Sequence, residues 1–265
     1  MDGKKREVGT SCKGRKRVLS LFEEFVLVLV RIRRGLDTEV VASLFGITQS
    51  HVSKIFISWV NLLYKCFLPL LEYPAADIVF HNMPKSFKKN FPTTRVVIDC
   101  SEIFVQTPRS VNAQRSTWSS YKSHNTFKFL LGIAPSGQTT FLSKLFSGSI
   151  SDREIVIQSG VLNLIERNDN VMADRGFNIR VLLLRKNAYL NIPAFSEGKQ
   201  LTPRAVQKSR RIASVRIHVE RAMESLKNYK IIIQGVIPLK LKNSLDQILT
   251  ICAVLSNLQD PLVNE

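Results

Sequence analysis

The sequence predicts an α/β protein whose mixed sheet is flanked by helices and preceded by a small all-α region. Up to residue 67 the apolar residues recur at helical spacing, whereas from residue 95 onward β-branched, alternating segments are interspersed with helical ones. The chain has 265 residues and 45% of them are hydrophobic, which suits one large buried core with a small appendage.

The charge balance favours a polyanionic partner. Lys and Arg number 38 against 21 Asp and Glu, which gives a net charge of +17 and a pI near 10.0. Such an excess is typical of proteins that bind nucleic acid, and an anionic membrane surface is the rival interpretation. No run of about 20 apolar residues is present to span a bilayer. We therefore expect DNA as the partner, and no membrane.

The cysteines are widely spaced, at Cys12, Cys66, Cys100 and Cys252. The absence of a Cys-x-x-Cys pair argues against a zinc finger and a disulfide framework, so a reducing compartment fits best. Residues 1–17 form a basic N-terminal arm, in which KKREVGTSCKGRKR would serve as a nuclear import signal or contact phosphates. A disordered solubilising end is the alternative. We expect a nuclear protein.

The first helix is predicted over residues 18–34. Its apolar positions Leu21, Phe25, Val28 and Ile32 have helical spacing, and Gly35 ends it.

A short helix, a turn and a longer helix are predicted next. The short helix runs from residue 37 to Phe45, Gly46 makes the turn, and Thr48 is the N-cap of a helix that reaches about Tyr64. The predicted buried stripe of the longer helix is Val52, Phe56, Trp59 and Leu63.

Residues 18–67 thus have the layout of a helix-turn-helix. In that motif, outward side chains at the start of the second helix enter the major groove of DNA. The outward side chains here are Gln49, Ser50, Ser53 and Lys54. An ordinary helical hairpin is the alternative interpretation.

Residues 68–94 contain four prolines and are predicted to be a linker, and residues 95–262 form a second domain. Strands are predicted at 94–106, 124–134 and 139–148, and Ser151 with Glu154 forms a capping box that opens a helix. A short strand ending before Gly176, a helix at 178–188, a strand at 189–195 and helices at 213–227 and 244–262 complete the order. Ribonuclease H-like nuclease cores share this order.

Three carboxylates stand out in the second domain. Asp99 lies inside the first predicted strand, where a buried unpaired carboxylate costs more than the roughly 2–7 kcal/mol of a neutral polar group. Asp174 ends the apolar strand VMAD, and Glu220 lies on the helix ASVRIHVERAMESLK. Three hard oxygen ligands suit Mg²⁺ or Mn²⁺. Two such ions can activate water and stabilise the leaving oxygen of a phosphodiester.

Each acid also has an ordinary explanation. An Asp at a strand end is often a turn residue, and a Glu on a helix usually faces solvent. Glu102 competes with Asp99, although strand alternation places it on the opposite face. Glu224 competes with Glu220, and spacing alone does not choose between them.

Five segments in order resemble the DDE superfamily endonuclease domain of Harbinger-like and insertion-sequence-type transposases. They are IDCSEI, YKSHNTFKFLLGIAPSG, GSISDRE, MADRGF and RIHVERAMESLK, and the resemblance covers roughly residues 95–260. It implies a ribonuclease H-like fold, divalent metal ions, and Asp99, Asp174 and Glu220 as the catalytic triad, which selects Glu220 over Glu224. The Gly-Thr-Glu that often follows the first Asp is replaced here by Cys100, Ser101 and Glu102.

Several cations near these segments are candidates for DNA contact. The segment WSSYKSHNTFK combines aromatic side chains with Lys122, His124 and Lys128, a mixture that can hold a strand by stacking and phosphate contact. Arg175 and Arg216 neighbour the acids and would meet phosphates or pair with a carboxylate.

Asp152 follows the N-cap Ser151, and we expect it to serve the helix dipole. The basic segment at 185–211 has many cations and one acid, which is typical of a phosphate-tracking surface.

The sequence predicts a DDE-type transposase or a derived nuclease that hydrolyses phosphodiester bonds and transfers DNA strands. A domesticated DNA-binding protein without nuclease activity is the alternative. The resemblance implies a homo-oligomer, because the family works on paired DNA ends. Many relatives carry a longer N-terminal region with an additional DNA-binding module, so an accessory DNA-binding protein could supply recognition of the DNA ends.

Overall fold

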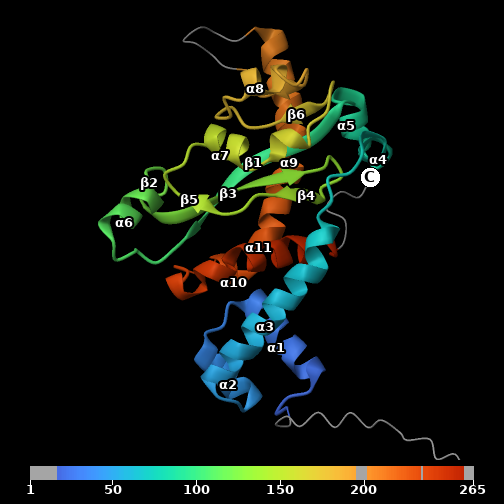
Figure 1. The fold of residues 1–265 in the computed structure, drawn as a ribbon. Coiled ribbons are helices and arrows are strands. Elements are labelled where there is room, and N and C mark those ends of the chain that lie inside the picture. Colours follow the sequence, from blue (N-terminus) through green and yellow to red (C-terminus); the bar gives the residue numbers. More distant parts are fainter. Residues whose placement is uncertain (1–16, 195–201, 234, 260–265) are drawn as a thin grey trace, which may run out of the picture.

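The computed structural model describes residues 17–194, 202–233 and 235–259 of the chain. A helical region lies at one end, and a mixed sheet with helices on both faces makes up the rest (Figure 1). The predicted basic arm lies outside the described residues except for its last residue, Arg17.

The helical region consists of α1 (Leu21–Arg34), α2 (Thr38–Phe45) and α3 (Gln49–Phe67). Gly35 and Gly46 adopt the left-handed conformation at the ends of α1 and α2, with φ of 65° and 63°, which favours glycine. The Thr48 hydroxyl accepts a hydrogen bond from the His51 backbone N–H at 3.3 Å and caps α3. These three predicted signals are confirmed.

Only part of the apolar stripe of α1 is buried. Val28 and Ile32 are buried, whereas Leu21 is 59% exposed because it occupies the first helical position, ahead of the packed turns. The carboxylate of Glu24 is buried instead and accepts a hydrogen bond from Trp59 Nε1 at 2.9 Å. Its burial is tolerated because this bond and an ion pair with Arg17 satisfy it.

Residues 68–94 contain more structure than a linker. The 3-10 turn η1 (Leu68–Leu70) and the short helices α4 (Ala76–His81) and α5 (Lys85–Asn90) lie here. Pro84 occupies the N-cap of α5, where a proline breaks no helical hydrogen bond. Phe87 is completely buried and anchors this segment to the core.

The sheet has the strand order β2-β3-β1-β6-β7, and β4 and β5 both pair with β3. The strands are β1 (Thr94–Phe104), β2 (Trp118–Ser119), β3 (His124–Ile133), β4 (Thr139–Leu142), β5 (Phe146–Ser147), β6 (Asn170–Met172) and β7 (Tyr189–Asn191). β1 runs antiparallel to β3 and parallel to β6, and β6 runs parallel to β7. This is the predicted ribonuclease H-like mixed sheet.

The predicted third strand is interrupted between β4 and β5. The backbone N–H of Leu145 donates to the Asp246 side chain at 2.7 Å instead of to a neighbouring strand. The Ser143 hydroxyl likewise accepts from the Leu130 N–H at 2.8 Å. Side-chain oxygens therefore accept the backbone hydrogen bonds where the pairing between strands ends.

Helices cover both faces of the sheet (Figure 1). On one face, Val97 and Ile103 of β1 belong to a hydrophobic cluster that also contains residues of α9 (Pro203–Lys227), α11 (Lys242–Asn257) and the helical region. On the other, Val96 and Ile98 pack with α7 (Asp152–Gln158), η2 (Val161–Asn163) and α8 (Arg180–Leu184). This alternation along β1 is the period-two pattern of a central strand.

Three short elements complete the described chain. They are α6 (Val111–Thr117), α10 (Lys230–Ile233) and η3 (Leu239–Leu241). Within the described ranges no single helix is both long and apolar enough to cross a membrane, although α2 and the segment Gln49–Leu70, bent by 100° between them, together have the required length and composition.

Candidate functional site

The candidate site lies where β1 extends beyond the end of its parallel neighbour, β6. β6 pairs with β1 as far as Val97, and β1 continues to Phe104. A cleft of about 740 Å³ opens along this uncovered edge. Ligand sites in open α/β sheets lie at the carboxyl ends of strands, as this one does. Its polar lining is Asp99, Cys100, Ser101, Glu102, Tyr121, Lys122, Lys128, Asp152, Asp174 and Lys227.

Asp99 projects from the middle of β1 into this cleft. Burial raises the pKa of its carboxyl group to about 6, while the positive charge of Arg216 and a hydrogen bond from the Cys100 backbone N–H oppose that rise. The charges of Asp174 and Asp152 raise it further. Asp99 is therefore a carboxylate that a nearby cation would stabilise.

Asp174 lies two residues after the end of β6 and lines the same cleft. Its Oδ1 accepts a hydrogen bond from the Arg175 backbone N–H at 2.7 Å and pairs with Arg216 Nη1 at 2.9 Å. The Asp174 side chain is 54% exposed and that of Arg216 is 14% exposed. The structure thus brings Asp99 and Asp174 together at one end of the sheet, with a largely buried guanidinium beside them.

Glu220 lies on α9, one turn after Arg216. It is exposed and does not line the cleft, although Met223 and Lys227 of the same helix do. Residues three and four apart share one helix face, so Glu220 stands on the stripe that borders the site. Glu224 is also exposed and does not line the cleft.

The opposite wall holds an ion pair that the sequence alone did not indicate. Lys128 Nζ lies 2.7 Å from Asp152 Oδ1 and also donates to the Ile150 carbonyl oxygen at 3.4 Å. Burial raises the pKa of the neighbouring Cys100 thiol, and the charge of Asp152 raises it further. Asp152 is therefore more than a helix-dipole residue. Its role depends on tertiary placement, because in sequence it resembles any acid in a first helical turn.

The remaining predicted DNA contacts occupy two surfaces. Lys122 and His124 are exposed near the cleft, where Lys122 Nζ lies 4.8 Å from the Tyr121 ring centroid and His124 stacks edge-on against Phe104. Arg175 is exposed beside Asp174. On α3, all four predicted side chains are exposed at its N-terminal end: Gln49, Ser50, Ser53 and Lys54.

The residues of the cleft fit a divalent cation in part. No cluster of three or more His, Cys, Asp or Glu side chains arranged to hold a metal occurs within 17–194, 202–233 and 235–259. Asp99 and Asp174 nevertheless supply hard carboxylate oxygens whose mutual repulsion a cation would relieve. Glu220 would have to turn toward them to complete a three-carboxylate set.

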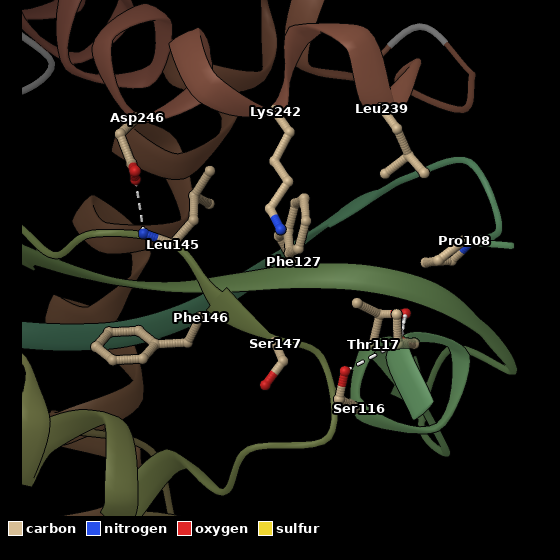
Figure 2. A pocket seen from close by; sticks show the side chains of 11 residues that line it. Pro108, Ser116, Thr117, Phe127, Leu145, Phe146, Ser147, Leu239, Lys242 and Asp246 are labelled. Atoms are coloured by element: carbon tan, nitrogen blue, oxygen red, sulfur yellow. Dashed lines mark hydrogen bonds between the residues drawn. The ribbon is translucent and has the colours of Figure 1, made fainter. Parts of the chain in front are cut away.

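A second pocket, of about 360 Å³, lies between β3, β5, α6 and α11 (Figure 2). Its carboxylate, Asp246, is engaged with the Leu145 backbone, and Lys242 lies over the Phe127 ring at 5.8 Å from the centroid. Among the described residues, the carboxylate that lines this pocket is alone and already hydrogen-bonded to the backbone, whereas Asp99 and Asp174 line the cleft together.

Comparison with known proteins agrees with both regions. The family described as DDE superfamily endonuclease matches residues 98–257, and the helix-turn-helix of DDE superfamily endonuclease matches residues 17–69. A curated protein of Arabidopsis thaliana, "Protein ALP1-like", is 22% identical over 252 residues, which are 91% of this chain. The match covers 61% of that relative's length.

Proposed function

This chain belongs to the DDE superfamily endonucleases, and on that premise we propose that it cleaves DNA phosphodiester bonds with divalent metal ions held by Asp99 and Asp174. The observation that carries the proposal is the meeting of these two carboxylates at an open cleft beside the uncovered edge of β1.

Several charged side chains in and beside the cleft have roles in this proposal. Asp99 and Asp174 hold the metal, and Glu220 completes the site from α9. Two Mg²⁺ or Mn²⁺ ions, when bound, supply an activated water and stabilise the leaving oxygen. Lys122 is exposed along the same cleft, where its ammonium group can neutralise a phosphate of the substrate strand, whereas Lys128 would first have to leave its ion pair with Asp152.

The helix-turn-helix region supports DNA as the substrate in this proposal. The exposed N-terminal end of α3 would enter the major groove, while the net charge of +17 attracts the phosphate backbone. We propose strand transfer as a second activity, in which the freed 3′-hydroxyl attacks a target DNA, and a nuclear location. Assembly on paired DNA ends and an accessory DNA-binding protein belong to the same proposal.

One observation favours a second candidate, a protein that binds DNA without cutting it. Arg216 neutralises Asp174, and Glu220 does not line the cleft. This arrangement is compatible with a DNA-binding derivative of a transposase.

Nicking of supercoiled plasmid in Mg²⁺ or Mn²⁺ tests the proposal. The native chain should nick the plasmid, and Asp99→Asn, Asp174→Asn and Glu220→Gln should each lower the rate by about 10² or more, because each removes charge stabilisation at the reacting phosphate. Asp77→Asn, an exposed acid on α4, is the matched control and should retain the rate. DNA binding without nicking by the native chain would establish the second candidate instead.

A further inference from the structure

We infer that Arg216 is a built-in counter-cation of the acidic cleft, and that it must leave Asp174 before the cleft takes up a divalent ion. The inference rests on the proposed function, because it takes Asp99 and Asp174 to be the metal ligands.

Arg216 serves both carboxylates at once. Its Nη1 lies 2.9 Å from Asp174 Oδ1, and its positive charge acts on Asp99 as well. The two acids repel each other across the cleft. The guanidinium supplies positive charge to both carboxylates, so the arginine and a metal ion would serve the same electrostatic need.

The contacts of Arg216 in the cleft do not satisfy all of its hydrogen-bond donors. Within the part of the chain that the structure describes, its Nε is buried with no hydrogen-bond partner. An unsatisfied buried donor costs free energy, which weakens the arrangement. Asp174 is 54% exposed, so an ion can approach it from solvent while Arg216 is still in place. A contact of this kind can be displaced by a doubly charged ion.

The helix that carries Arg216 also carries the third acid. Arg216 and Glu220 are four residues apart on α9, a spacing that places their side chains on one face, about 5–6 Å apart at Cβ. Met223 and Lys227 continue this face along the cleft. When Arg216 moves out, Glu220 is the carboxylate on that face next to the vacated position. Departure of the arginine and completion of the acidic set are therefore linked through α9.

Mn²⁺ binding to the full chain, measured by isothermal titration calorimetry without DNA, tests this inference. Arg216→Gln and Arg216→Met both remove the charge, and the second retains an apolar stem. Each should bind Mn²⁺ at least about tenfold more tightly than the native chain, because the competing cation is gone. Arg216→Lys keeps the charge and should restore weak binding. A merely structural role for Arg216 would not produce this order.

Arg211→Gln is the matched control. Arg211 is exposed on the same helix and lies away from the cleft, so its loss changes the net charge equally and should leave Mn²⁺ affinity unchanged. Adding Asp174→Asn to Arg216→Gln should abolish the gain in affinity. The melting temperature of every variant, with and without Mn²⁺, confirms folding and should show the larger Mn²⁺-induced rise in the charge-removing variants.

The outcomes separate the inference from the proposed function. Equal Mn²⁺ affinity in the native chain and both charge-removing variants, with binding lost on Asp174→Asn, overturns the inference and leaves the metal site standing. Absence of Mn²⁺ binding in all of them overturns both the inference and the metal site.

Discussion

Arg216 of α9 and Asp174, which follows β6, are joined by an Nη1–Oδ1 contact of 2.9 Å across 42 positions of the chain. The contact links the helix that carries Glu220 to the strand end that carries the second acid. The cation lies mostly inside the protein and the carboxylate lies half outside. The pair therefore falls between a surface and a buried salt bridge in its energetics.

Removing one partner of this ion pair should lower the free energy of unfolding more than removing both partners does. Asp174→Ala leaves the Arg216 guanidinium largely buried without its carboxylate, so we expect a loss of about 1–2 kcal/mol in the free energy of unfolding. Adding Arg216→Met should recover part of that loss. Urea unfolding in a chelating buffer, arranged as a double-mutant cycle, measures the coupling. Strictly additive losses would show that the contact contributes nothing, and Asp77→Ala serves as the exposed control.

The carboxyl group of Asp99 should make stability depend on pH. Burial raises its folded pKa from 3.8 to about 6. The folded state then binds more protons than the unfolded state between these values, so stability falls as pH rises through that window. Asp99→Asn removes this loss. Without metal the variant should match the native chain near pH 4 and exceed it at pH 7 by about 1–3 kcal/mol.

Chemical unfolding from pH 4 to pH 8 in a chelating buffer checks this behaviour of Asp99. A stability difference between Asp99→Asn and the native chain that stays constant across the whole range would contradict the buried-carboxyl explanation. In a second series without chelator, Mn²⁺ should reverse the order at pH 7, because only the native chain keeps the ligand.

The parts of the fold that could be predicted are those determined by residues close together in the sequence. Gly35, Gly46 and Thr48 end or start helices through their own backbone and side-chain chemistry, so their roles could be inferred from neighbouring residues. The strands β1 and β3 were recognisable from their β-branched and alternating residues, whereas their order within the sheet was not predicted. The helix α5 was missed because prolines suggested a linker, although Pro84 stands where a helix tolerates proline. The short helix α6 was missed because its sequence lacks an apolar stripe.

The acidic cleft was only partly predictable, for a different physical reason. Asp99 was recognisable as a carboxylate in an apolar strand. The partners that now surround it come from distant elements: Arg216 from α9, and Asp152 with Lys128 from α7 and β3. Such contacts depend on how the helices dock on the sheet. The outward turn of Glu220 depends on the same docking, and no spacing along the chain encodes it.

Gly148 should not tolerate a side chain. An added Cβ would lie 2.6 Å from the Thr117 carbonyl oxygen and 2.8 Å from that of Thr126, both of them backbone atoms. We expect Gly148→Ala to lower the free energy of unfolding by about 1–3 kcal/mol, since α6 and β3 would have to separate. Gly176 is the matched comparison, because its added Cβ would meet only Asp152 Oδ2, at 4.0 Å. Gly176→Ala should change stability by less than about 0.5 kcal/mol, and a loss equal to that of Gly148→Ala would refute the crowding argument.

The helix-turn-helix should contact DNA through the start of α3 and not through its end. Lys54 is exposed near the N-terminal end of the helix, and Lys65 is exposed in its last turn. Lys54→Ala should weaken DNA binding and reduce the slope of log affinity against log salt by about 1, because one phosphate contact is lost. Lys65→Ala removes the same charge and should leave that slope unchanged. Fluorescence anisotropy with a duplex, titrated between about 50 and 200 mM salt, measures both, and the native affinity should fall by about 10³ over that range. Equal effects of the two substitutions would mean that the net charge of +17 attracts DNA without a defined recognition helix.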